Sequence, residues 1–377
     1  MSDAGSSRDS GLLDRIAARL LDASVLERLA IAIASTGLAL LIGLVIVAAA
    51  GYDAIQFLGY VLEGSFGDSS AISRTLKFTT LFILTGVAVA IAFRAGIFNI
   101  GVQGQFVVGG FTTVISILWL APMVPEGTVG GIILLLFGFL AAAVAGGAYA
   151  AFPGALKAYT NTNEIITTIM LNFIAIGAVG WLVEGPFRGE GQAAANTERI
   201  PEYVSLPQIV YDVPDFSIVG LAVALVVAIL ISVVLVRTSF GYDIVTSGYQ
   251  ESAAAYAGVD AKRMIVVTMT ISGMVAGIAG AIFAIMIQGY YSNPGGIATY
   301  GYDAIAVSLL AANNPIGAIP AGLLFGGLDS ATSYIGLSSN IPPELIDGIV
   351  GLVVLFVAAP ELFRMAARRT GLGGDDR

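Results

Sequence analysis

The chain has 377 residues, of which 57% are hydrophobic and 11% are charged, and its mean hydropathy is +0.89. This composition is typical of proteins that cross a membrane many times, and it excludes an ordinary soluble globular domain. Cysteine and histidine are both absent, which excludes disulfides and cysteine or histidine metal sites and argues against an enzyme.

The charge balance is acidic, with a formal net charge of -9 at pH 7. Only three lysines occur, Lys77, Lys157 and Lys262. Strong acidity with few lysines suits a protein from a halophile, because salt screens the repulsion between surface carboxylates.

The sequence predicts an all-α integral membrane protein with ten transmembrane helices. A helix needs roughly 20 apolar residues to cross the hydrocarbon core. The predicted spans are 29–50, 79–93, 105–121, 129–152, 165–183, 216–236, 264–288, 302–312, 317–335 and 346–363.

An even number of spans puts both termini on one side of the membrane. Most Lys and Arg residues then lie in the two tails and in the loops of that side, which the positive-inside rule identifies as cytoplasmic. We therefore expect a multi-pass protein of the cytoplasmic membrane. Its predicted parts are a cytoplasmic tail at 1–28, a transmembrane domain at 29–363 with an external loop at 184–215 and a cytoplasmic loop at 237–263, and a cytoplasmic tail at 364–377.

Two places interrupt the apolar pattern. The segment RAGIFNIGVQGQ, residues 94–105, inserts amides and glycines between two spans, and residues 302–312 would extend only about 16 Å as a helix at ~1.5 Å per residue. The second segment is therefore predicted to be a half-helix. Interrupted spans at corresponding places in two halves point to the central site of a transporter. They also suggest a pseudo-repeat of spans 2–5 with spans 7–10.

The candidate residues of a substrate pathway are mostly amides. Amides both donate and accept hydrogen bonds without burying a charge, which suits a neutral small-molecule solute. For each, a structural alternative stays open, namely capping of a broken helix, tying two helices together, or aromatic packing. The candidates are Phe98, Asn99, Gln103, Gln105, Asn172 and Asn313.

Two further groups are expected to be structural. Asn163 and Glu164 begin the fifth span, where an N-terminal cap and an acidic side chain both stabilise a helix. Gly273, Gly277 and Gly280 form a small-residue face that permits close helix contact.

The cytoplasmic loop contains a short run of small, helix-compatible residues at 249–257 between Gly248 and Gly258, which favours a helix lying along the membrane surface. A solvated connector is the alternative. No GxxxxGK[ST] phosphate-binding loop occurs in the sequence, so ATP, if used, is expected to bind a partner subunit.

Five ordered blocks of the sequence resemble the permease subunits of ABC importers, in the superfamily that serves ribose-type sugars, nucleosides and branched-chain amino acids. The likeness is strongest to permeases for nucleosides and simple sugars. The blocks are FRAGIFNIGVQGQ at 93–105, NEIITTIMLNFIA at 163–175, RTSFGYDIVTSGYQESAAAYAGV at 237–259, ISGMVAGIAGA at 271–281 and YDAIAVSLLAANNPIGAIPAGLLFG at 302–326.

The resemblance implies alternating access, a separate ABC ATPase subunit, a second permease chain as homodimer or heterodimer, and an external solute-binding protein. Membrane lipid surrounds the chain, and the resemblance implies no cofactor, no metal and no nucleic acid partner. It also implies a coupling helix that contacts the ATPase, with the residues Gly248, Tyr249, Glu251, Ala253, Ala254, Tyr256 and Gly258.

The chain departs from the family pattern at four places. Gln103 replaces a glutamate, Val245 and Thr246 replace an Arg-Ala pair, Gln250 and Glu251 replace Asn-Pro, and Ala311 and Ala312 replace Gly-Arg. These changes indicate a divergent branch or one member of a heterodimer.

An ion-coupled secondary transporter of a polar solute is the alternative. Such a protein needs carboxylates or exposed carbonyls within the membrane to bind its coupling ion. Acidic residues inside the predicted spans are scarce, and Asp329 and Asp347 are the main candidates.

Overall fold

The computed structural model describes residues 25–191, 194–208, 216–249, 251–256, 258–296, 299–342, 344–353 and 355–356. Contacts divide the chain into two compact units, one of residues 1–58 and 340–377 and the other of residues 59–339. Both predicted cytoplasmic tails lie wholly or largely outside the described residues.

The first unit contains α2 (Val25–Ala49) and the helical residues 344–353, which pack against each other. A Cβ added to Gly43 would lie 2.7 Å from Cγ2 of Ile349, so the two helices cross closely at this glycine. α2 corresponds to the first predicted span. The C-terminal helix occupies the start of the tenth.

α3 (Ala54–Phe66) crosses from the first unit into the second and was not predicted from the sequence. The side chain of Asp53 accepts hydrogen bonds from the backbone N–H groups of Ile55 and Gln56 at 2.8 and 2.9 Å, and so closes the first turn. Thirteen residues are too few to cross a membrane, and the predicted spans were apolar runs of about 20 residues, so they did not include this helix.

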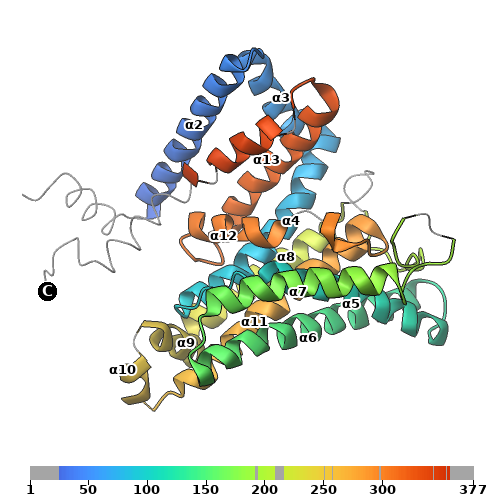
Figure 1. Ribbon diagram of the computed structural model, residues 1–377, viewed down its shortest axis with the longest axis vertical. Helices are drawn as coiled ribbons and strands as arrows, with labels where there is room; N and C mark the ends of the chain where they lie inside the picture. The colour runs from blue at the N-terminus through green and yellow to red at the C-terminus, as the bar shows by residue number, and fades with distance from the viewer. Residues whose placement is uncertain are drawn as a thin grey trace, which may run out of the picture. The chain divides into compact units, whose positions relative to one another are not determined.

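The second unit holds most of the helices (Figure 1). They are α4 (Ser69–Arg94), α5 (Val102–Leu120), η1 (Ala121–Met123), α6 (Thr128–Thr160), α7 (Glu164–Glu184), α8 (Ile218–Arg237), α9 (Ser239–Tyr249), α10 (Glu251–Tyr256), α11 (Ala261–Ile282), the π-helix η2 (Phe283–Gln288), η3 (Pro294–Gly296), α12 (Tyr300–Leu310) and α13 (Ala318–Ser338). Among the described residues, six helices are long and apolar enough to cross a membrane: Ser69–Arg94, Val102–Met123, Thr128–Thr160, Glu164–Glu184, Ile218–Arg237 and Ala261–Gln288.

These six helices coincide with the second to seventh predicted spans. The predicted half-helix is α12, which has only 11 residues. α13 occupies the ninth predicted span, although its lower hydropathy leaves it outside the six.

Glycines allow the central helices to approach each other closely. A Cβ at Gly277 of α11 would lie 2.2 Å from the carbonyl oxygen of Ala142 in α6, and one at Gly273 would lie 2.3 Å from that of Gly146. A Cβ at Gly280 would meet the carbonyl oxygen of Phe106 in α5 at 2.1 Å. The predicted packing role of the α11 glycines is therefore confirmed.

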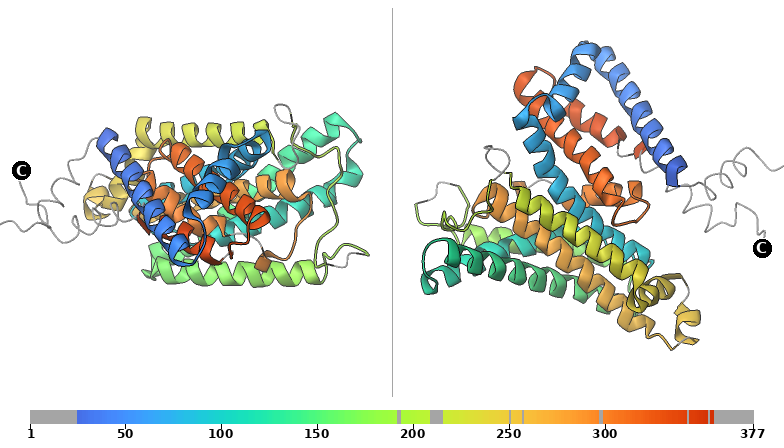
Figure 2. Two further views of the ribbon diagram at one scale, coloured as in Figure 1. Left: turned by 90° about the horizontal axis from the view of Figure 1, so that it is seen from above. Right: turned by 180° about the vertical axis from the view of Figure 1, so that it is seen from behind.

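Several ends of the long helices gather on one side of the second unit (Figures 1 and 2). This group contains the ends of α4, α6 and α8 and the beginnings of α7 and α11, with α9 and α10 beside them. The basic residues of these helix ends are Arg94, Lys157, Arg237, Lys262 and Arg263.

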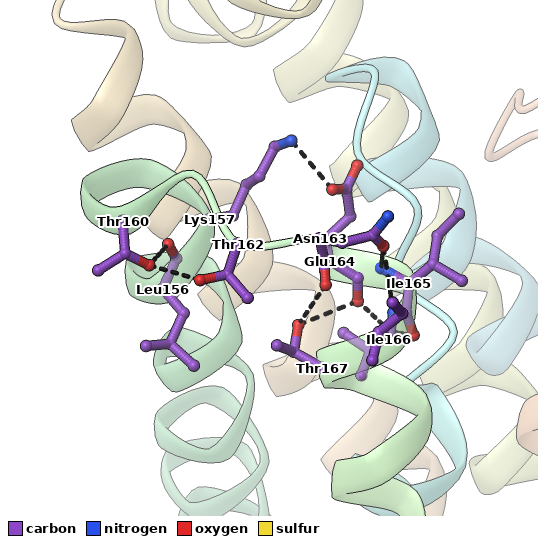
Figure 3. A network of polar contacts seen from close by, with 10 residues as sticks. Leu156, Lys157, Thr160, Thr162, Asn163, Glu164, Ile165, Ile166 and Thr167 are labelled. Carbon is purple, nitrogen blue, oxygen red and sulfur yellow. Dashed lines mark hydrogen bonds and ion pairs between the residues drawn. The ribbon is translucent and has the colours of Figure 1, made fainter.

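Hydrogen bonds and an ion pair stabilise the connection between the end of α6 and the start of α7 (Figure 3). The Asn163 side chain accepts hydrogen bonds from the backbone N–H groups of Ile165 and Ile166 at 3.0 and 3.2 Å. Glu164 lies 3.0 Å from the Lys157 amino group, so an ion pair joins the two helices. The predicted capping at the start of this helix is confirmed.

At the opposite end, part of the long predicted external loop is folded against the chain that follows η2. The backbone N–H groups of Thr197 and Ile200 donate to the carbonyl oxygens of Tyr291 and Gly289, both at 2.9 Å. Tyr291 is fully buried, and its hydroxyl donates to the carbonyl oxygen of Val107 in α5 at 3.0 Å. These contacts fix this part of the loop to the membrane helices.

Candidate functional site

The break between α4 and α5 is a compact turn. α4 ends at Arg94, and the N–H of Gly96 donates to the Phe93 carbonyl at 3.1 Å while that of Ile97 donates to the Ala92 carbonyl at 3.0 Å. Gly96 has a φ of 67°, a left-handed conformation that glycine adopts without a Cβ clash. The turn therefore satisfies the last carbonyls of α4 before the chain continues to Asn99.

Asn99 is completely buried and lies at the centre of a polar network. Its amide and that of Gln105 form two reciprocal hydrogen bonds, each 3.0 Å long. Asn99 Nδ2 also donates to Ser272 Oγ of α11 at 2.8 Å, and Asn99 Oδ1 accepts from the Gly101 N–H at 3.0 Å. The Ser272 hydroxyl in turn donates to the carbonyl oxygen of Ala88 in α4 at 2.6 Å. A fully satisfied buried network of this kind holds its helices in one arrangement.

The Asn172 side chain, from α7, caps the N-terminal end of α5. Its Oδ1 accepts from the N–H of Gly104 at 2.8 Å, and its Nδ2 donates to the carbonyl oxygen of Ile100 at 2.9 Å. The first N–H groups of a helix have no partner within the helix, and hydrocarbon offers none. Of the two alternatives left open for Asn172, the structure shows the tying of two helices.

The Gln103 side chain, from α5, caps the N-terminal end of α12 in the same way. Its Oε1 accepts from the N–H of Gly301, the second residue of α12, at 2.8 Å. A Cβ at Gly301 would lie 2.3 Å from the Gln103 backbone nitrogen, so the first turns of the two interrupted helices are in direct contact. The two breaks that the sequence predicted separately therefore meet in space.

Asn313 and Phe98 lie at the edge of this region. Asn313 has a φ of 56° at the break between α12 and α13, and its Oδ1 accepts from the Ser308 hydroxyl at 3.0 Å. The Phe98 ring packs on the Phe93 ring with centroids 4.9 Å apart, which is the packing alternative for this residue. Both residues are half-buried.

The structure brings five of the six pathway candidates to the α4–α5 break and to the first turn of α5. The sixth, Asn313, contacts this break through the hydrogen bond that its carbonyl oxygen accepts from Arg94. In this conformation, the four amides Asn99, Gln103, Gln105 and Asn172 are buried and bonded to other parts of the chain. Contact between these residues and a solute stays a prediction.

Sequence reasoning missed Ser272 in this region, and it predicted a different role for Arg94, as a marker of topology or a partner of lipid headgroups. Ser272 lies within one of the blocks that carry the family resemblance, but a single serine among glycines gave no signal of its own. Arg94 donates from Nε to the carbonyl oxygen of Asn313 at 3.0 Å, and so joins the two breaks. A contact between residues 219 positions apart cannot be read from local pattern.

The predicted cytoplasmic loop forms two helices where the sequence predicted one. The predicted helix at 249–257 is observed as the shorter α10, Glu251–Tyr256, and α9 precedes it. The N–H of Val259 donates to the Ala254 carbonyl at 2.9 Å, and Gly258 has a φ of 83°, so a left-handed glycine terminates α10 as expected.

Within this loop, Tyr256 is 99% exposed whereas Ala254 is completely buried by its own chain. The side chains of Tyr249, Glu251 and Ala253 lie outside those that the structure describes. Gly248 packs against Ala95 in the α4–α5 turn. Among the residues of the predicted coupling set whose side chains the structure describes, Tyr256 is therefore a fully exposed one that another protein can contact.

Comparison with known proteins places this arrangement in a family. The family described as "branched-chain amino acid transport system / permease component" matches residues 71–358. No solved structure matches the chain significantly.

Three curated relatives match over nearly their whole length. The chain is 32% identical to the guanosine ABC transporter permease of Bacillus subtilis, over 87% of this chain and 92% of the relative. It is 28% identical to a nucleoside ABC transporter permease of Lactococcus lactis, over 84% and 87%. It is 29% identical to the glucose ABC transporter permease of Haloferax volcanii, over 90% and 89%. The chain therefore belongs to the family of ABC transporter permease components.

Proposed function

We propose that this chain is the permease subunit of an ATP-driven importer that moves a nucleoside or a simple sugar across the cytoplasmic membrane by alternating access. The observation that carries the proposal is the match to guanosine, nucleoside and glucose permeases over more than four fifths of the chain. Because the sequence contains no phosphate-binding loop motif, the proposal assigns ATP hydrolysis to a partner subunit.

The α9–α10 segment supports the placement of that partner. It connects two long apolar helices, α8 and α11, and lies at the helix ends that carry Arg94, Lys157 and Arg237. Basic residues favour the cytoplasmic side of a membrane. The proposal therefore places both this segment and the two termini in the cytoplasm, where an ATPase subunit has access to the exposed Tyr256.

The packing of the second unit supports the proposed pseudo-repeat. α4 packs along α13 as α11 packs along α6, and α12 contacts α4 as α5 contacts α11. Exchanging α4 with α11, α5 with α12 and α6 with α13 therefore maps one set of neighbours onto the other. Such an exchange is the pattern expected of an internal repeat. With α2, α12, α13 and the C-terminal helix as further membrane segments, the proposal keeps ten spans.

The proposed partners beyond the ATPase are a second permease chain and an external solute-binding protein. Long stretches of α7 and α8 expose large apolar side chains, such as Phe173, Trp181, Val226 and Leu230. These faces suit lipid or another permease. A homodimer and a heterodimer are both compatible with this proposal.

The neutral amides around the two breaks support a neutral solute. The acidic balance of the chain and the relative from Haloferax volcanii suit a halophilic source. If the solute contacts Asn99 or Gln105, it must replace hydrogen bonds that these amides now make to each other. Such an exchange would couple solute passage to a change in helix packing.

The proposal is tested by uptake of labelled guanosine and labelled glucose into vesicles that contain this chain with its ATPase subunit. We expect uptake to require ATP and to persist when an ionophore removes the ion gradients. Uptake that needs an ion gradient and no ATPase would instead establish an ion-coupled secondary transporter. A panel of other nucleosides and sugars in the same assay would identify the solute.

A further inference from the structure

In the coupling loop, the segment that contains α9 and α10, Gly248 approaches the α4–α5 turn so closely that backbone meets backbone. A Cβ added to Gly248, near the end of α9, would lie 2.2 Å from the carbonyl carbon of Ala95 and 2.4 Å from its oxygen. Conversely, a Cβ added to Gly96 would lie 2.8 Å from the Gly248 carbonyl oxygen. Since no side chain separates the two backbones, neither can move toward the other without displacing it.

A second contact, one helical turn earlier, holds α9 on the same turn. Ile244 is 1% exposed and belongs to one buried cluster with Ala92, Ala95, Ile97, Leu235 and Met269. Residues four apart in a helix lie on the same face, so Ile244 and Gly248 present one continuous surface to the turn. α9 is therefore fixed to this turn at two points.

Hydrogen bonds connect this turn to both interrupted segments. Asn99, two residues after Ile97, is hydrogen-bonded to Gln105 and Ser272. Arg94, at the other end of the turn, donates to the carbonyl oxygen of Asn313 at the α12–α13 break. A displacement of the turn must therefore strain or shift both breaks.

We propose that the contact between Gly248 and the Ala95–Gly96 turn transmits movement of the coupling loop to the two interrupted membrane segments. The inference rests on the proposed function, because it takes the ATPase subunit to move α9 and α10. Close-packed backbones transmit displacement, since protein interiors have low compressibility. A longer side chain at this point would bend or change rotamer and absorb part of the motion.

Gly248→Ala tests the inference, because the added methyl group overlaps backbone atoms and must move α9 away from the turn. Gly336→Ala in α13 is the matched control, because it is also a helical glycine and a Cβ there meets nothing within 4 Å. We measure ATP hydrolysed per labelled guanosine or glucose taken up, using the complex of permease and ATPase. We expect Gly248→Ala to raise this ratio about tenfold, within the range typical of coupling between sites, and Gly336→Ala to leave it unchanged.

Ile244→Ala provides a second variant that removes atoms rather than adding them, and it decides the question if Gly248→Ala does not reach the membrane. We expect it to raise the same ratio while the ATPase still copurifies. A wild-type ratio in Ile244→Ala, or in Gly248→Ala, overturns the inference. Loss of ATPase binding in Gly248→Ala also overturns it, because the residue would then serve docking rather than transmission.

A third measurement follows the turn directly, since the chain contains no cysteine and a single introduced thiol is unambiguous. In Ile100→Cys, we expect vanadate trapping of the ATPase to change the rate of thiol labelling, and Gly248→Ala in the same chain to abolish that change. An equal change in both chains overturns the inference. Wild-type uptake that needs no ATPase would refute the proposed function, an outcome separate from all of these.

Discussion

The Gln103 side chain of α5 accepts a hydrogen bond from the backbone N–H of Gly301 at the start of α12, at 2.8 Å. Each of the two helices begins in the interior of the second unit, where water is not available to its first N–H groups. A side chain from a neighbouring helix replaces that water. The start of each interrupted helix therefore depends on the other.

Replacing Gln103 by leucine should destabilise the protein by about 1–3 kcal/mol, because the Gly301 N–H loses a buried acceptor. The measurement is thermal unfolding of the purified chain in detergent. Gln103→Glu keeps an oxygen in the same position and should lose less. Equal unfolding temperatures for Gln103→Leu and the wild type would show that this hydrogen bond contributes nothing.

Asn99 and Gln105 should behave as one unit in a double-mutant cycle. Asn99→Leu alone removes the partner of both Gln105 hydrogen bonds to Asn99. Gln105→Leu alone removes the same two bonds from the Asn99 amide, because the bonds are reciprocal. The double variant should therefore lose less stability than the sum of the single variants, by about 0.5–3 kcal/mol. Strict additivity in the unfolding measurements would contradict the network. Labelled-solute uptake by the same variants tests the pathway role.

Glycine-to-alanine substitutions should have opposite effects at Gly277 and Gly177. A Cβ at Gly277 would overlap the Ala142 carbonyl oxygen, so the substitution should destabilise the chain by about 1–3 kcal/mol. At Gly177 the space is open, and alanine should stabilise the helix by up to about 1 kcal/mol. Unfolding temperatures of the two variants in the same detergent provide the check. A stable Gly277→Ala chain would mean that α6 and α11 are not in close contact.

Tyr256→Ala should weaken binding of the ATPase subunit without destabilising the permease. The side chain is 99% exposed, so its removal should change the free energy of unfolding by no more than about 0.5 kcal/mol. Exposed aromatic residues often dominate an interface, and a loss of about 2 kcal/mol in binding is expected. Copurification of the ATPase with each variant gives the measurement. The control is Tyr159→Ala, at an exposed tyrosine in the last turn of α6. If the two variants bind the ATPase equally well, Tyr256 does not contribute to the interface.

The buried position of Ala254 changes the expected effect of a bulky substitution there. The family resemblance implied that Ala254 belongs to a coupling helix that contacts the ATPase, yet Ala254 is covered by its own chain. Ala254→Arg would therefore disturb the loop itself, and Tyr256 is the better probe of partner contact. Burial of one alanine in a run of three cannot be read from their identical side chains.

The sequence by itself determined the class of the protein, the positions of its long helices and its family. Apolar runs of about 20 residues and ordered motif blocks are local properties, and the interruptions at Asn99 and in α12 were visible for the same reason. The tertiary structure decided how these interruptions are satisfied. The partners of Gln103 and Asn172 lie on other helices, and that of Arg94 lies in the α12–α13 break. Which distant segment supplies a hydrogen bond depends on packing rather than on local composition.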